Sequence, residues 1–378
     1  MGRVTVRQAR APDADAVAAF TGDTWGERHD DYIPRVFAEW VASDDERQRT
    51  FVATVEPADL ESPVDSAESG STAGSEGIDD AGVVTGDGTG AASAGEPEAV
   101  VGCVQGVLLS EWESWAQGIR VNPATRGLGV GSRLSEAVLD WARSAGATVC
   151  RNMVFSWNVA GLGQSRAVGF DPGTEFRFAR PDPMAAPTSR PETVVDDPDP
   201  DAVWAFWSRS DARDHLDGLG LDPGESWSCS QLTRERLATA AAEDRLIAIR
   251  DDGITAFALH TRVWEREADD KDGDNADSDN ADGDSDNADS DSDNADGDGD
   301  EDENPVERNA IYGNTAWRDA EAAGDLLNAI AHDAAGHDAD SVRAFIPETV
   351  AHVSDVAANR VEVSAEPDFV MTADLTTR

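Results

Sequence analysis

Lysine is nearly absent from this sequence, since Lys271 is the only lysine among 378 residues and arginine carries almost all of the positive charge. Acidic residues outnumber basic ones by 76 to 30, and the formal net charge is −46. A chain with this charge repels nucleic acid and anionic membranes. We therefore expect neither nucleic acid nor a membrane as a partner.

The excess of acid also indicates the solvent in which the chain folds. Together with apolar positions that rely on Ala and Val, it resembles the composition of proteins from extreme halophiles. In molar salt the Debye length falls to about 3 Å, which screens the repulsion between carboxylates. An acidic surface is then compatible with a folded and hydrated protein.

Cysteine is scarce as well. Cys103, Cys150 and Cys229 form no CxxC pair, and reduced, buried thiols are typical of cytoplasmic proteins. The first ten residues are polar and charged, and no run approaches the roughly 18 apolar residues of a membrane span. These features predict a soluble, cytoplasmic protein.

Two segments, 57–97 and 268–304, have too few apolar residues to form a core and are predicted to be disordered. In the second, Asp282, Asp284 and Asp286 alternate with small residues, as carboxylates do in calcium loops. No Glu closes a twelve-residue loop of that kind, so we favour a solvated acidic insertion over a calcium site.

The remainder of the chain reads as two similar halves, because Pro-Asp-Ala-Asp-Ala-Val-Ala-Ala-Phe at 12–20 recurs as Pro-Asp-Pro-Asp-Ala-Val-Trp-Ala-Phe at 198–206. In each, an Asp precedes an apolar run and can accept hydrogen bonds from the free amides of a helix start. We interpret this as a duplication, with domains at 1–180 and 192–378 joined by a linker at 181–191.

Each half then repeats one order of elements: strands, a long helix and further strands. The first half is expected to have strands at 50–56, 99–109, 115–121 and 148–156 and a helix at 129–145. The second is expected to have strands at 245–250, 254–263, 309–313 and 341–346 and a helix at 319–335. This order predicts an α/β fold, with a sheet that has helices on both faces.

A glycine-rich segment follows the third predicted strand: Arg126, Gly127, Leu128, Gly129, Val130, Gly131 and Ser132. Glycine lets the backbone approach a ligand closely, and the free amides of a first helical turn favour an anion such as pyrophosphate. The P-loop ending Gly-Lys-Ser/Thr is absent, and Ser132 and Leu134 occupy the places where a dinucleotide fingerprint has its last glycine.

The motif Arg-x-x-Gly-x-Gly, formed by Arg126, Gly129 and Gly131, resembles the acyl-CoA signature of the Gcn5-related N-acetyltransferase (GNAT) superfamily. The resemblance implies a mixed, mostly antiparallel sheet flanked by helices, in two tandem copies here. It also implies acetyl-CoA as co-substrate, no metal, and direct acyl transfer in a ternary complex. The strand at Ile119 and Val121 would supply a backbone amide to polarise the thioester carbonyl.

A second family feature is Asn158, followed after twelve residues by Phe170, which by resemblance borders the pantetheine arm. The position of the family's acidic Tyr holds Ser165, a weaker acid that can steady a thiolate by a hydrogen bond. The usual base positions hold Trp115 and Met153. Glu111 and Glu113 are therefore the candidate bases, although a solvated acidic loop is the more ordinary interpretation of both.

The resemblance places the acceptor near residues 21–32, where Trp25, Glu27 and Tyr32 form a candidate aromatic and acidic mouth for an amine. Packing against the sheet is the alternative for the two rings. The histidines, His215, His260, His332, His337 and His352, show no ligand spacing, so we predict no metal site.

The second half aligns Arg318 with the first signature but has Glu321 and Ala323 in place of its glycines, so we predict that it is degenerate and does not bind CoA in that manner. The function expected is acetyl transfer from acetyl-CoA to a primary amine of a small molecule or a protein. The alternatives are a non-catalytic acyl-CoA-binding or regulatory module and a structural protein. The sequence identifies neither the acceptor nor the oligomeric state.

Overall fold

The computed structural model describes residues 4–22, 24, 31–56, 98–185, 190–267 and 306–377. Both predicted insertions, 57–97 and 268–304, lie outside the described residues, and so do Trp25 and Glu27. Within the described ranges, no helix is long and apolar enough to span a bilayer.

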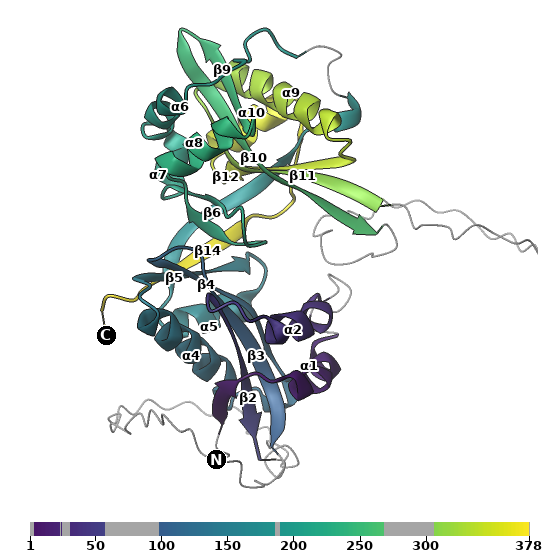
Figure 1. Ribbon diagram of the computed structural model, residues 1–378, viewed down its shortest axis with the longest axis vertical. Helices are drawn as coiled ribbons and strands as arrows, with labels where there is room; N and C mark the ends of the chain where they lie inside the picture. Colours follow the sequence, from purple (N-terminus) through teal and green to yellow (C-terminus); the bar gives the residue numbers. More distant parts are fainter. Residues whose placement is uncertain are drawn as a thin grey trace, which may run out of the picture.

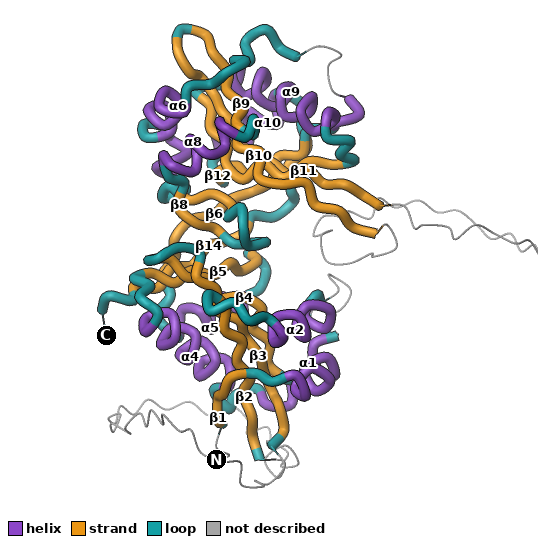
Figure 2. The backbone as a smooth tube through the Cα atoms, in the orientation of Figure 1, coloured by secondary structure: helices purple, strands orange, loops and turns teal. Residues whose placement is uncertain are grey.

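One mixed sheet runs through the molecule, in the order β1-β2-β3-β4-β5-β14-β6-β12-β11-β10-β9, with β13 beside β6 (Figures 1 and 2). Its first strands are β1 (Thr5–Gln8), β2 (Gln48–Val55), β3 (Ala99–Leu108), β4 (Glu113–Val121), β5 (Val149–Phe155) and β6 (Asp171–Arg180). The later ones are β9 (Leu246–Asp251), β10 (Gly253–Glu267), β11 (Val306–Trp317), β12 (Ser341–Pro347), β13 (Glu362–Val363) and β14 (Asp368–Asp374). A separate hairpin pairs β7 (Leu219–Leu221) with β8 (Cys229–Gln231).

The pairs β4–β5 and β11–β12 are parallel, and the other pairs of this sheet are antiparallel. The predicted α/β class, a mixed and mostly antiparallel sheet flanked by helices, is therefore confirmed. The expected strands and long helices also lie where the sequence pattern put them, with ends that differ by a few residues.

The C-terminal strand β14 does not stay with the second half. It pairs with β5 along its whole length and with β6 on its other side, so it completes the sheet of the first half (Figure 1). Strand β6 in turn pairs with β12 of the second half. The predicted boundary at 181–191 stays a prediction, because the sheet continues across it.

Helices cover both faces of the sheet in the first half (Figure 2). Helix α4 (Val130–Ser144) presents Val130, Leu134 and Val138 at four-residue spacing, and all three are buried against β2 and β3. Helices α1 (Ala14–Thr21) and α2 (Ile33–Ala42) pack on the opposite face, and α5 (Val159–Ala167) follows β5. Burial of each such aliphatic side chain stabilises the fold by about 1.5–3 kcal/mol, which fixes α4 against the sheet.

The second half has the same layering. Helix α9 (Ala320–Gly336) packs on one face of β9–β11, and α6 (Pro200–Trp207) and α8 (Arg234–Ala242) pack on the other. Helices α7 (Asp211–His215) and α10 (Val350–Ala358) complete it. In both halves a long helix connects two parallel strands that pair over only part of their length. The duplication itself stays a prediction.

The two repeated helix starts differ in detail. Asp199 accepts a hydrogen bond from the Asp201 amide at 3.0 Å, as a cap should. Asp13 instead accepts from the Arg10 amide at 2.7 Å and forms an ion pair with the Arg7 guanidinium at 2.8 Å. Asp13 therefore holds the short turn before α1 by local contacts and does not cap the first turn of α1 itself.

Candidate functional site

The candidate site begins with a gap between two parallel strands. β4 and β5 pair only at three positions, Glu113 with Val149 through Trp115 with Arg151. Beyond them the strands separate, so residues 116–121 of β4 pair with no strand on the β5 side in the described part of the chain. Backbone groups along an unpaired strand edge can accept or donate hydrogen bonds to an extended ligand.

The glycine-rich loop lies at the open end of this gap, where β4 ends and α4 begins. Gly127 and Gly129 have φ values of +83° and +75°, and a Cβ at either would meet no atom within 4 Å. Only glycine adopts this left-handed backbone readily.

Helix α4 starts without a side-chain cap, because its N-cap is Gly129. The amides of its first turn, at Val130, Gly131 and Ser132, therefore face the loop as hydrogen-bond donors at the positive end of the helix dipole. Arg126 is exposed beside them and has no ion-pair partner among the described residues. The arrangement suits an anion.

Helix α5 is tied to this first turn by Gln164. Its Nε2 donates to the Gly131 carbonyl at 3.2 Å and to the Ser135 hydroxyl at 2.7 Å. The sequence analysis did not identify Gln164, although its place within the segment that follows Asn158 was a signal. This contact fixes the distance between the two helices that flank the gap.

Asn158 and Ser165 both make internal hydrogen bonds. Asn158 is the N-cap of α5 and accepts from the Gly161 amide at 2.9 Å. Ser165 is buried, with 2% of its surface exposed, and accepts from the Asn152 amide group at 3.1 Å. This bond joins α5 to β5 and leaves the hydroxyl proton of Ser165 without an assigned acceptor among the described residues, so its acid role stays a prediction.

Glu111 and Glu113 lie at the closed end of the gap, at the opposite end of β4 from the glycine loop. Glu113 is buried, pairs with Arg151 at 2.8 Å and accepts the Gln231 amide at 3.0 Å. Glu111 is exposed, and its carbonyl lies near Gly146 beyond the far end of α4. Fifteen helical residues span about 22 Å, so Glu111 lies far from the glycine loop, and its role as base stays a prediction.

Residues from β4 and from the segment just before α2 form another part of the site. Arg120 lies on the splayed part of β4. Its guanidinium forms a buried ion pair with the Asp31 carboxylate through two hydrogen bonds of 2.5 and 3.0 Å. The Arg120 guanidinium also lies over the Tyr32 ring, 5.6 Å from its centre. Burial raises the pKa of Tyr32 to about 12, so its phenol is protonated at neutral pH.

The second half contributes a carboxylate that the sequence analysis missed. Glu225, in the turn between β7 and β8, accepts a hydrogen bond from Gln117 Nε2 of β4 at 2.9 Å. The pKa of Glu225 is raised, mainly by burial. Its turn is held by Asp222, which accepts from the Glu225 amide at 3.1 Å, and by Arg262, which donates to the Glu225 carbonyl at 3.4 Å.

The corresponding helix start in the second half is closed. Asp319 caps α9 and accepts from the Ala322 amide at 3.0 Å, while Arg318 pairs with Asp319 at 2.8 Å. A carboxylate thus occupies the place where the first half leaves free amides. The loss of anion binding in the second half stays a prediction.

Comparisons with known proteins agree with this geometry. Residues 67–163 match the model of the acetyltransferase (GNAT) family, a range that contains the glycine loop and Asn158. No curated protein matches the sequence.

Among solved structures, a GCN5-related N-acetyltransferase from Sphaerobacter thermophilus aligns over 98% of this chain and 96% of its own, with 13% identity and a TM-score of 0.51. The ribosomal-protein-S18-alanine N-acetyltransferase from Escherichia coli aligns over 46% of this chain and 82% of its own, with 16% identity and a TM-score of 0.29. A GCN5-related N-acetyltransferase from Kribbella flavida aligns over 46% and 84%, with 19% identity and a TM-score of 0.29. The chain therefore contains a match to the acetyltransferase (GNAT) family in its first half and, over nearly its whole length, shares the fold of a GCN5-related N-acetyltransferase.

Proposed function

We propose that the first half binds acetyl-CoA and transfers its acetyl group to a primary amine of a small molecule or a protein. The observation that carries this proposal is the splayed β4–β5 pair, whose open end meets an uncapped helix start with two unobstructed glycines. The family match supports acyl transfer. Acetyl as the acyl group and an amine as the acceptor are parts of the proposal.

The pyrophosphate would be held by the amides of Leu128 to Ser132, and the exposed Arg126 would add a charge-assisted contact. The thioester arm would then extend along the unpaired edge of β4, past Val121 and Ile119. From residue 121 to residue 117 the strand covers about 13 Å. The thioester would therefore come near Gln117, where its carbonyl would accept a backbone amide.

Transfer requires the amine nitrogen to attack the thioester carbonyl carbon, after which the carbon–sulfur bond breaks and the CoA thiolate leaves. A base must take one proton from the amine. We assign this role to Glu225, because its carboxylate is hydrogen-bonded to Gln117 on the splayed part of β4. Burial raises its pKa toward the working range of a general base.

Tyr32 would line the acceptor side. Its ring is next to Arg120, and the charge of Glu225 acts on its phenol. Asp31 is neutralised by Arg120, so Glu225 would supply the negative charge that attracts a cationic acceptor. Trp25 and Glu27, proposed for the same mouth, lie outside the described residues.

The binding step is tested by calorimetric titration of acetyl-CoA into the full chain in molar KCl. We expect one site per chain, and its loss in Gly129→Glu, because a carboxylate there repels the pyrophosphate. Gly129→Ala separates backbone strain from charge and should bind more weakly than wild type but measurably. Gly253→Glu is the matched control, since Gly253 also has positive φ and open space around it but lies in the β9–β10 turn.

Equal affinity of wild type and Gly129→Glu would exclude the loop as the cofactor site. Saturable binding without turnover on any amine would favour the alternative, a regulatory acyl-CoA-binding module. The burial of Ser165 and the pairing of Glu113 are the observations that keep this alternative open.

A further inference from the structure

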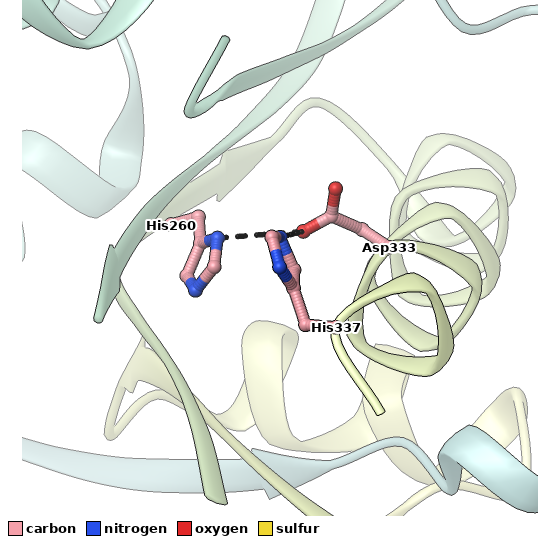
Figure 3. Close-up of side chains that lie close together, drawn as sticks. All are labelled: His260, Asp333 and His337. Atoms are coloured by element: carbon pink, nitrogen blue, oxygen red, sulfur yellow. Dashed lines mark ion pairs between the residues drawn. The ribbon is translucent and has the colours of Figure 1, made fainter. Parts of the chain in front are cut away.

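A second cluster of ligand side chains lies in the other half of the molecule. His260, Asp333 and His337 each direct one ligand atom toward a common point, and these atoms all lie within 4.8 Å of one another (Figure 3). His260 is on β10, Asp333 is in the last turn of α9, and His337 directly follows that helix. The sequence showed no ligand spacing because His260 is far from the other two residues along the chain.

We propose that His260, Asp333 and His337 bind a divalent transition-metal ion of the zinc type. Two imidazoles and one carboxylate are ligands that such ions prefer. This inference is independent of acetyl transfer, because it rests on residues of β10, β11 and the end of α9 and on none of the residues proposed to bind acetyl-CoA or the amine.

The distances are close to those of a coordination shell. His260 Nδ1 and His337 Nε2 lie 3.6 and 3.7 Å from the same Asp333 carboxylate oxygen, Oδ2. In a tetrahedral site with metal–ligand bonds of about 2.0–2.1 Å, neighbouring ligand atoms are about 3.3 Å apart. Small side-chain rotations would therefore bring the three atoms around one ion.

The local fold holds two of these ligands in place. The ladder between β10 and β11 shifts register on both sides of His260, and such a bulge redirects a side chain. The His260 ring stacks on Tyr312 with a centre distance of 5.1 Å, and the Tyr312 hydroxyl donates to Asp333 Oδ2 at 2.7 Å. A carboxylate oxygen can accept this bond and still bind a metal, so Tyr312 is a positioning residue.

The third ligand leaves the site accessible. Asp333 and His337 are one helical turn apart, which places both side chains on one face of the helix end. His260 is buried, whereas 44% of the His337 side chain is exposed. A metal could therefore enter from solvent beside His337, and a fourth coordination position would remain for water or another ligand.

Arg245 is a further charged side chain near the cluster. Arg245 donates to the His260 carbonyl at 3.1 Å and is itself paired with Glu243, so its charge is largely compensated. The His260 and His337 rings are 4.5 Å apart at their centres.

The test is calorimetric titration of Zn²⁺ into the chelator-treated full chain in molar KCl, with excess Mg²⁺ present to occupy sites made of carboxylates alone. We expect one site per chain that binds Zn²⁺ in preference to Mg²⁺. Asp333→Asn and His337→Ala should each weaken it at least tenfold, and Tyr312→Phe should weaken it by about 10–100-fold, as for loss of a supporting hydrogen bond.

His332→Ala is the matched control, because it removes a histidine from the same helix and should leave Zn²⁺ affinity unchanged. Co²⁺ provides a second readout, since imidazole coordination gives visible absorption bands that His337→Ala should remove. His337 is partly exposed, so its replacement should not unfold the chain, and circular dichroism checks this. Absence of a Mg²⁺-resistant Zn²⁺ site, or equal affinity in folded His337→Ala, would overturn the proposal.

Discussion

Replacing Glu225 with Gln is the sharpest perturbation of the proposed chemistry. The amide of Gln keeps an oxygen that can accept the 2.9 Å hydrogen bond from Gln117, so the β7–β8 turn should stay in place. The variant loses the ability to take a proton, and with it the negative charge proposed to attract the acceptor, so KM for the amine should also rise. General bases contribute about 10²–10⁴-fold to rate, and we expect kcat to fall by that factor while acetyl-CoA affinity is unchanged.

The pH dependence gives a second, independent signature. Burial raises the pKa of Glu225, so wild-type activity should fall on the acid side as this carboxylate becomes protonated. Glu225→Gln should lack this fall. A raised carboxyl pKa also means that the ionised form destabilises the folded state above the unfolded pKa. The variant should therefore be as stable as wild type at neutral pH, or more stable.

The change in kcat and its pH dependence are measured by steady-state acetylation of an amine panel, detected through the free thiol that is released. The change in stability is measured by denaturant unfolding. Glu175→Gln is the control, because Glu175 is a partly exposed glutamate that faces His215 instead of β4. Activity of Glu225→Gln within twofold of wild type, with the same pH profile, would refute the assignment. If the folded wild-type chain does not bind acetyl-CoA, the proposed function itself is refuted.

Three further predictions concern stability. Glu113→Ala should lower the free energy of unfolding by about 3–5 kcal/mol, because it leaves the buried Arg151 charge without its partner; Asp140→Ala, at an exposed ion pair, should cost at most about 1 kcal/mol in the same urea titration. Burial lowers the pKa of His352 from 6.5 to about 4. The free energy of unfolding of wild type should therefore fall by about 3 kcal/mol as the pH is lowered from 6.5 to 4. An equal fall in His352→Gln would contradict this. Dilution from molar to about 0.1 M KCl increases the Debye length from about 3 to about 10 Å, so the excess carboxylates repel one another more strongly. Circular dichroism should then show unfolding. Unchanged stability would contradict the prediction that the protein is halophilic.

Local patterns were sufficient for much of the fold. The four-residue spacing of Val130, Leu134 and Val138 predicted helix α4, since only a helix places these side chains on one face. The glycines before it predicted a strand-to-helix turn, and the structure adds that Gly127 and Gly129 adopt the left-handed backbone there. These features depend on residues that are close together in sequence, so the sequence alone could specify them.

The roles of individual acids and histidines could not be predicted in this way. Glu113 and Glu225 are both glutamates in an acidic chain, and nothing local separates one that is paired with Arg151 from one that faces Gln117. Their environments come from strand pairing and from a hairpin of the other half. The same limit applies to His260, whose neighbours Asp333 and His337 reach it only through packing of α9.

The sequence by itself predicted the elements, the glycine-rich turn before α4 and the loss of its glycines at Glu321 and Ala323 in the second half. The tertiary structure decided that β14 joins β5, that β4 and β5 separate after three paired residues, and that Glu225 lies beside β4. The physical reason is distance along the chain: helix and turn preferences act over a few residues, while sheet order and side-chain environments depend on contacts between segments that only the folded chain brings together.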